Sequence, residues 1–350
     1  MLQTLIIAPN WIGDAVMSEP LVKGVLQTGA RVTILATPWV APVYRAMSGV
    51  TEILEADFSH GKLELSKRRA LAHLIKNKGF DDAIILPNSW KSVLIPWLAM
   101  IPRRYGYQGE FRSFFLSKSL PNPPRFDRPP MVNHYLALAN LLGSDFSTRL
   151  ETSPRPTLEV SEGLLSDAKT LLTSLPNPEN FYVLAPGAEF GPAKQWPNEH
   201  FAKLAELILN DNPMTNVVFM GSSKDVMIAQ KITQLISLKY QNRILDLCGK
   251  TSLDQSIALI AKAQGLASND SGMMHIGAAF CIPQVAFYGS SDPHHTPPLS
   301  PFAGILFLGL DCSPCHQRKC PLGHLNCLKQ ITPESALTEL QQRIYQLKVT

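Results

Sequence analysis

Ala185-Pro-Gly-Ala-Glu-Phe-Gly-Pro-Ala-Lys-Gln-Trp-Pro197 lies between two segments with different hydrophobic periods. The residues before it, Phe181 to Leu184, form a short apolar run typical of a buried strand, and residues 197–208 repeat apolar side chains at helical spacing. The stretch is therefore predicted to be a loop between a strand and a helix. Its two glycines allow close approach of a ligand, and Lys194 supplies a positive charge. Such a loop suits an anion such as a diphosphate, although an ordinary connection with a solvated lysine explains the same residues.

The rest of the chain repeats this alternation in two series. The first series begins with an apolar strand at 2–8, whose following loop contains Asp14, and the second begins at Phe181. Alternating strands and helices predict mostly parallel sheets covered on both faces, with a ligand crevice at the carboxyl ends of the strands. Asp14 is expected at such an end, where it is either a capping residue or a catalyst.

Polar loops follow the strands of the second series in the same way. They contribute Glu189, Lys194, Asp225, Asp270 and Ser271, each placed after a predicted strand. Because the carboxyl ends of parallel strands meet at one edge, these side chains are expected to converge on one rim. Two facing doubly wound domains with a cleft between them would then handle a nucleotide-linked substrate.

Length and composition agree with this organisation. The 350 residues predict an N-terminal domain at 1–165, a helix end and linker at 166–178, a second domain at 179–330 and a C-terminal helix at 331–350. Apolar residues make up 45% and charged residues 17%, which excludes a disordered chain. The sequence lacks an apolar run of about 18 residues, so we expect a cytoplasmic protein that is free to touch the inner membrane from that side.

The stretch from Arg103 to Arg128 interrupts the alternation. It contains six Lys or Arg residues, among them Arg103, Arg104 and Arg112, and aromatic residues lie between them: Tyr105, Tyr107, Phe111, Phe114 and Phe115. A solvated basic loop explains this composition, and so does a surface that binds a phosphorylated amphiphilic acceptor, since arginine binds phosphate in bidentate fashion. No nucleic-acid-binding motif accompanies the stretch, so nucleic acid is not expected as a partner.

Four of the six cysteines lie close together in the sequence, with the spacing Cys312-x2-Cys315-x4-Cys320-x6-Cys327. Stable disulfides are not expected in a cytoplasmic chain. The Cys-x2-Cys start is typical of a structural zinc site, whereas the irregular later spacings favour reduced or buried thiols. Both interpretations are open from the sequence.

Several blocks, taken in order, resemble one family. They are Trp11-Ile-Gly-Asp14, Pro186-Gly-Ala188 with Lys194-Gln-Trp-Pro197, and Asn269-Asp-Ser-Gly272 with His275. This combination resembles the ADP-heptose:lipopolysaccharide heptosyltransferases of glycosyltransferase family 9, over nearly the whole chain. Further segments, including Gly106 to Arg112 and Thr296 to Leu299, are most similar to the type II members, which add the second inner-core heptose.

The resemblance implies a glycosyltransferase-B fold and inverting transfer from ADP-heptose to a lipid A-core acceptor at the inner face of the cytoplasmic membrane, with no cofactor and no catalytic metal. It implies that Asp14 is the base and that Lys194 stabilises the leaving diphosphate. Such a base takes a proton from the acceptor hydroxyl, and cations or aligned N–H groups stabilise the departing anion.

The donor-binding residues implied by the resemblance are Gly187, Ala188, Glu189, Lys194, Asp225, Asp270, Ser271, Gly272 and His275. Structural roles stay open for Asp270, as a helix cap, and for His275, as a core residue bonded to backbone; Asp225 is expected where an acidic residue can hold the ribose, without preference over a structural role. Two other functions also stay open. One is a type I or type III heptosyltransferase acting on another core acceptor, and the other is a non-catalytic nucleotide or lipid A-core binding protein.

Overall fold

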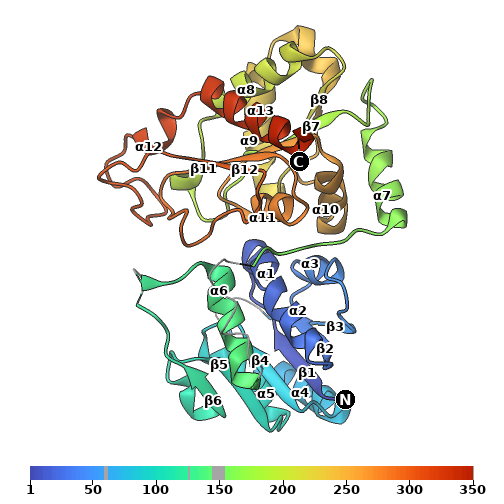
Figure 1. Ribbon diagram of the computed structural model, residues 1–350, viewed down its shortest axis with the longest axis vertical. Coiled ribbons are helices and arrows are strands. Elements are labelled where there is room, and N and C mark those ends of the chain that lie inside the picture. The colour runs from blue at the N-terminus through green and yellow to red at the C-terminus, as the bar shows by residue number, and fades with distance from the viewer. Residues whose placement is uncertain (59–61, 125–126, 144–153, 350) are drawn as a thin grey trace. The chain divides into compact units, whose positions relative to one another are not determined.

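The computed structural model describes residues 1–58, 62–124, 127–143 and 154–349. The chain divides into two compact units, Met1–Glu159 and Val160–Thr350. This division lies before the predicted linker at 166–178, because helix α7 (Glu162–Lys169) packs against helix α10 (Leu253–Lys262) of the second unit. Each unit contains a parallel sheet flanked by helices, as the alternation predicts (Figure 1).

The sheet of the first unit is parallel and has six strands in the order β3-β2-β1-β4-β5-β6. The strands are β1 (Gln3–Ile7), β2 (Arg31–Ala36), β3 (Glu52–Glu55), β4 (Asp82–Ile85), β5 (Arg103–Tyr107) and β6 (Lys118–Leu120). Strands β2 and β3 follow on one side of β1, and β4, β5 and β6 follow on its other side. The carboxyl ends of β1 and β4 therefore form a topological switch point, where open parallel sheets bind ligands.

Helices cover both faces of this sheet. They are α1 (Ile12–Met17), α2 (Glu19–Gln27), α3 (Ala41–Arg45), α4 (Leu65–Lys78), α5 (Trp90–Leu98) and α6 (Met131–Leu136). Alternate strand residues such as Leu5, Ile7 and Ile85 pack against α4 and α5 in one hydrophobic cluster. The intervening residues, Ile6 and Ile34 among them, are also fully buried. Burial on both faces explains why the sequences of these strands are continuous apolar runs without alternating polar residues.

The basic stretch does not interrupt the fold, contrary to the expectation from its composition. Arg103 to Tyr107 and Lys118 to Leu120 are the strands β5 and β6, which extend the parallel sheet beside β4. The alternation is hidden because β5 begins with two arginines and contains Gly106. A Cβ atom at Gly106 would lie 2.5 Å from Nη2 of Arg112, so the strand needs glycine where this side chain passes.

The second unit repeats the topology of the first. Its parallel six-stranded sheet has the order β12-β11-β10-β7-β8-β9, so the switch point lies between β7 and β10. The strands are β7 (Phe181–Ala185), β8 (Asn216–Phe219), β9 (Ile244–Asp246), β10 (Gly265–Asn269), β11 (Gln284–Tyr288) and β12 (Ala303–Phe307). The loop predicted from Ala185 to Pro197 therefore begins at the carboxyl end of a central strand.

The remaining helices of this unit are α8 (Asn198–Asp211), α9 (Val226–Leu235), α11 (Gly272–Ala279), α12 (Asn326–Lys329) and α13 (Pro333–Val349). Helix α13 packs against α8 and against β10, β11 and β12. A capping box opens α10, because the Ser252 side chain accepts from the backbone N–H of Gln255 and the Gln255 side chain accepts from the backbone N–H of Ser252. Within the described ranges, no helix is long and apolar enough to cross a membrane.

Candidate active site

Asp14 lies at the switch point of the first unit, after the carboxyl end of β1. It occupies the first turn of α1, so it belongs to a short helix and not to the predicted loop. A carboxylate in the first turn of a helix is stabilised by the positive end of the helix dipole. Asp14 is half-buried, which leaves one side open to solvent.

Two buried tyrosines surround this carboxylate. Burial raises the pKa of Tyr135 well above its usual range, and hydrogen bonding to the nearby Asp14 carboxylate raises it further. Burial is also the main cause of the raised pKa of Tyr44, whose hydroxyl lies 2.9 Å from Oγ of Ser18. Both phenols therefore stay protonated, and the Tyr135 hydroxyl can donate to Asp14. The sequence does not single out these tyrosines, because nothing in their spacing connects α3 and α6 with α1.

Lys194 and Asp270 form an ion pair at the switch point of the second unit. Lys194 follows β7 and Asp270 follows the neighbouring strand β10, and Nζ of Lys194 lies 2.5 Å from Oδ2 of Asp270. The Lys194 side chain is 19% exposed and the Asp270 side chain 5%. Both groups are therefore largely removed from water, where a charge pair interacts more strongly than at the surface.

Asn269 holds the loop against β10. This fully buried side chain donates from Nδ2 to the carbonyl of Pro186 at 2.7 Å and accepts from the backbone N–H of Trp196 at 2.9 Å. Trp196 is buried as well, stacks on Phe287 with 4.0 Å between the ring centroids, and donates to the carbonyl of Ile331 at 2.9 Å. The loop that carries Lys194 is thus anchored at both ends, which fixes the position of the lysine.

Asp225 lies in the turn that follows β8, and its side chain lies close to Gly187 of the same loop. Its carboxylate accepts from the backbone N–H and from the hydroxyl of Ser222, both at 2.8 Å, in a capping box. A Cβ atom at Gly187 would lie 2.5 Å from the carboxyl carbon of Asp225. Gly187 is therefore needed for this close approach, and the capping role of Asp225 accounts for one of its oxygens.

The neighbouring loop residues are less enclosed. Ala188 is buried, whereas Glu189 is exposed and forms an ion pair with Lys224, another exposed residue. Exposed pairs of this kind contribute little to stability. Glu189 therefore lies at the outer side of the loop.

Ser271 and Gly272 open helix α11 beside Asp270. Ser271 is the residue before the first helical position, but its side chain makes no capping hydrogen bond. The hydroxyl groups of Ser271 and of Ser291, which follows β11, are buried and lack a hydrogen-bond partner among the described residues. Buried hydroxyls without a partner are costly, so such groups are suited to a bound polar ligand.

His275 lies on α11, one turn beyond Ser271. It is 5% exposed, and burial lowers its pKa to about 4 despite the nearby carboxylate of Asp270. The imidazole is therefore neutral at physiological pH. A neutral buried histidine cannot supply positive charge to a phosphate, so Lys194 is the cation in this group.

The three arginines expected to bind the acceptor, Arg103, Arg104 and Arg112, all make hydrogen bonds within the first unit. Arg103 begins β5 and donates to the Asp82 carboxylate at 2.6 Å, at the amino-terminal edge of the sheet and opposite the edge that carries Asp14. Arg104 is next to it and donates from Nε to the carbonyl of Phe115 at 2.7 Å. Both residues therefore lie at the amino-terminal end of β5.

Arg112 has a structural role. It is fully buried, and it donates from Nε to the carbonyl of Tyr107 at 2.8 Å and from Nη1 to the carbonyl of Pro87. Burial lowers the pKa of Arg112 to about 10, which still leaves it charged. We therefore do not retain Arg112 as an acceptor-binding residue. Arg125, in the same basic stretch, lies outside the described residues.

The comparisons with known proteins agree with one another. Residues 68–326 match glycosyltransferase family 9 (heptosyltransferase). The chain belongs to this family. It is 36% identical to lipopolysaccharide heptosyltransferase 2 of Escherichia coli K12 over 99% of each chain, and 36% identical to lipooligosaccharide heptosyltransferase 2 of Haemophilus influenzae over 97% of this chain and 98% of that one.

A solved structure from the same family resembles this one. The structure of E. coli ADP-heptose LPS heptosyltransferase II has a TM-score of 0.86 and 34% sequence identity, and it covers 99% of this chain and 100% of its own. The chain is thus a glycosyltransferase of the heptosyltransferase family, and the expected glycosyltransferase-B class, with two doubly wound α/β domains, is confirmed.

Proposed function

We propose that this glycosyltransferase moves L-glycero-D-manno-heptose from ADP-heptose to the inner-core heptose of heptosyl-Kdo2-lipid A, with inversion at the transferred carbon. The observation that carries the proposal is the Lys194–Asp270 pair at a topological switch point, in a chain aligned from end to end with heptosyltransferases of type 2. The related E. coli protein is described as an ADP-heptose LPS heptosyltransferase II, which supports ADP-heptose as the donor.

The second unit would bind the ADP-heptose. An ammonium group has three N–H donors, so the contact between Lys194 and Asp270 leaves donors for a phosphate oxygen. The start of α11 and the hydroxyls of Ser271 and Ser291 add donors without positive charge. These groups would stabilise the negative charge that grows on the diphosphate as the sugar leaves, without a metal ion.

The remaining donor residues would contact the sugar and the nucleoside. Oδ2 of Asp270 faces Lys194, and its second oxygen is suited to a sugar hydroxyl. Asp225, held close to Gly187, is placed to accept from ribose hydroxyls with the oxygen that the capping box does not use. Ala188, Glu189, Gly272 and His275 would shape the pocket around these contacts, His275 as a neutral group.

Asp14 would act as the general base. An inverting transfer needs a carboxylate that accepts the proton of the attacking hydroxyl while the sugar gains oxocarbenium character. The half-buried position of Asp14 at the switch point of the first unit fits this role, and the Tyr135 hydroxyl would hold the carboxylate in one orientation. A fixed base reduces the reorganisation that proton transfer requires.

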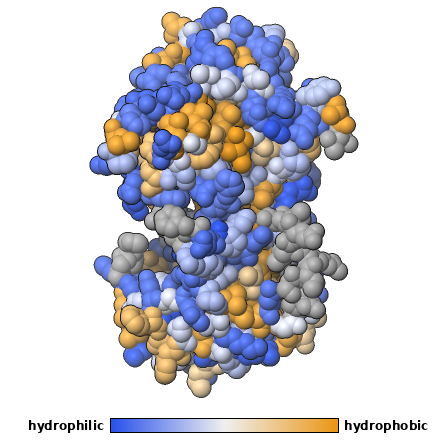
Figure 2. Space-filling model, turned by 60° about the vertical axis from the view of Figure 1, so that its left-hand side comes forward, coloured by the Kyte–Doolittle hydropathy of each residue, from blue (hydrophilic) through white to orange (hydrophobic). Residues whose placement is uncertain are grey.

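The acceptor is a lipid, so we propose that the enzyme works in the cytoplasm at the inner face of the cytoplasmic membrane. Figure 2 shows exposed hydrophobic residues that are grouped in patches on the face drawn. In the first unit, Phe111 is 100% exposed and Phe114 86% exposed, in the same segment as the exposed Lys118. Exposed aromatic side chains near basic residues favour the surface of an anionic bilayer.

The test is ADP release from ADP-heptose with two acceptors, Kdo2-lipid A and its singly heptosylated form. We expect turnover on the heptosylated acceptor alone. Turnover on the unsubstituted acceptor alone would keep the mechanism and reassign the enzyme to type I. Binding of ADP-heptose without turnover on either would contradict the proposed acceptor and favour a type III enzyme or a binding protein.

A further inference from the structure

The segment that carries the four clustered cysteines has an unusual organisation. Residues 308–325 connect β12 to α12 with turns and bends, and without a helix or a strand. Loops longer than about 12–15 residues without secondary structure are uncommon in compact domains and are usually either functional or disordered. Cys312, Cys315 and Cys320 lie in this segment, and Cys327 lies in α12 directly after it.

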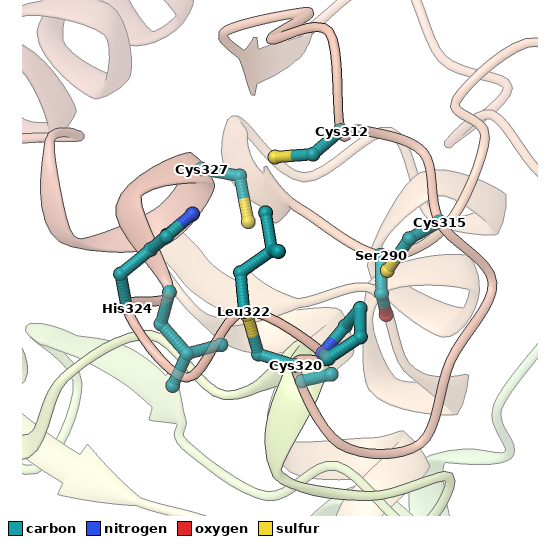
Figure 3. A pocket seen from close by; sticks show the side chains of 10 residues that line it. Ser290, Cys312, Cys315, Cys320, Leu322, His324 and Cys327 are labelled. Atoms are coloured by element: carbon teal, nitrogen blue, oxygen red, sulfur yellow. The ribbon is translucent and has the colours of Figure 1, made fainter.

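The four cysteines surround a single small cavity (Figure 3). The cavity measures about 10 Å³, and Ser290 and His324 also line it. None of the cysteines forms a disulfide. The sequence left open whether these thiols meet, because the spacings after Cys315 are irregular. The turns of the loop bring them together, which favours a common ligand.

The surroundings of the thiols also favour a ligand. Backbone N–H groups of Leu322, Gly323 and Leu325 point at the sulfur of Cys320. Hydrogen bonds from surrounding groups orient the ligands of metal sites, and these amide donors lie where they would orient the Cys320 sulfur. Ser290 is 1% exposed, and its hydroxyl has no partner among the described residues although it lines the cavity. That buried hydroxyl is a second and independent sign of a missing polar partner.

His324 is less suited than the cysteines to bind a metal ion. Its Nδ1 accepts from the backbone N–H of Asn326 at 3.0 Å. In a neutral imidazole the other nitrogen then carries the proton, so neither nitrogen offers a free lone pair. The four sulfurs are the better ligand set, because zinc and related cations bind four thiolates in tetrahedral sites.

We propose that Cys312, Cys315, Cys320 and Cys327 bind one thiophilic divalent cation of the zinc class as a structural site. As their side chains lie in this structure, no group of three or more His, Cys, Asp or Glu among the described residues could hold a metal ion. Binding must therefore draw the sulfurs together. Rotation of the Cys312, Cys315 and Cys320 side chains between staggered rotamers, in a segment without a strand or helix to restrain it, would bring them toward Cys327 on α12.

The proposed site would support the loop that carries Lys194. The backbone N–H of Ala193 donates to the carbonyl of Arg318 at 3.1 Å, and the backbone N–H of His316 donates to the carbonyl of Ser290 at 2.6 Å. The Arg318 guanidinium also lies 5.5 Å from the ring centre of Phe190. A metal ion that organises residues 312–327 would thus stabilise the neighbouring loop, whatever reaction the enzyme performs.

The test measures metal binding directly. The full-length chain, purified without a polyhistidine tag and under reducing conditions, is analysed for transition metals. The metal-free reduced chain is then titrated with Co²⁺ in the absence of oxygen. We expect about one metal ion per chain on isolation, or a stoichiometric thiolate-to-cobalt charge-transfer band on titration. Because the titration uses the wild-type chain, misfolding of a variant cannot hide the site.

Variants identify the ligands. Cys315→Ser/Cys320→Ser should lose the metal and the charge-transfer band, whereas Cys281→Ser, which replaces a cysteine outside the cavity, should keep both. The proposal is overturned if the wild-type chain holds less than roughly a tenth of a metal ion and gives no charge-transfer band. An unchanged band in the double variant would overturn the ligand assignment.

Discussion

Replacing Lys194 by Met separates the electrostatic role of this residue from its packing. Methionine keeps an unbranched apolar side chain and removes the charge. The partner, Asp270, is then left 5% exposed without the ammonium group that lies 2.5 Å away in the wild-type enzyme. We expect both the stability of the second unit and the rate of heptose transfer to fall.

The two effects differ in size. Removing one member of a buried ion pair costs about 3–5 kcal/mol. Because the Lys194 side chain is 19% exposed, water can partly solvate the remaining carboxylate, and we expect a loss of about 2 kcal/mol. This corresponds to a fall of about 4–8 °C in Tm for a unit of this size. Loss of a preorganised contact to the leaving group should lower kcat by about 10²–10³-fold.

The double variant Lys194→Met/Asp270→Asn distinguishes structure from catalysis. It has no uncompensated carboxylate, so its thermal unfolding should return most of the way to that of the wild-type enzyme. Its turnover should stay low, because the cation that faces the diphosphate is still missing. The assays are thermal unfolding and coupled detection of ADP release at saturating donor. A kcat/KM within about threefold of wild type for Lys194→Met would refute the reasoning.

Four further changes test other parts of the site. Asp14→Asn should lower kcat by about 10²–10⁴-fold and leave ADP-heptose affinity unchanged in calorimetry, since only the base is lost. Gly187→Ala should raise the KM for ADP-heptose about tenfold, because its Cβ would displace the Asp225 carboxylate. Arg112→Met should lower the free energy of unfolding by about 3 kcal/mol in urea titrations, because it leaves buried carbonyls without donors. Burial lowers the pKa of His275 to about 4 in the folded enzyme, whereas the pKa of this residue in the unfolded chain is near 6.5. As the pH falls from about 7 toward 4, the unfolded chain therefore binds the proton first, and the free energy of unfolding decreases. Between pH 7 and pH 5 this residue should account for about 2 kcal/mol, which His275→Asn should remove.

Each of these changes has an outcome that would contradict it. Turnover near wild type in Asp14→Asn would remove Asp14 as the base, and unaltered donor KM in Gly187→Ala would show that Asp225 does not contact the donor. A weakened acceptor KM in Arg112→Met, without lower stability, would restore Arg112 as an acceptor ligand. Equal pH dependence of the wild-type enzyme and His275→Asn would show that this imidazole titrates normally.

Local sequence patterns predicted most of the secondary structure. The apolar run from Phe181 to Leu184 predicted strand β7, the run at 2–8 predicted strand β1, and the capping box at Ser252 marks the start of α10. These elements are set by short-range rules, namely hydrophobic period and side-chain capping. The strands β3, β5, β6 and β12 were not predicted, because they are edge or near-edge strands with charged or glycine residues. Their pairing partners decide their conformation.

The sequence by itself determined the doubly wound fold class, the family and the positions of Asp14, Lys194 and Asp270 just after strand ends. Strand ends and helix starts are local, so residue order is enough to place such loops at the carboxyl edge of a sheet. Only the tertiary structure decided which side chains meet. It pairs Lys194 with Asp270 and buries Arg112 beneath β5, because contacts between distant segments depend on strand order and packing, which no local pattern encodes.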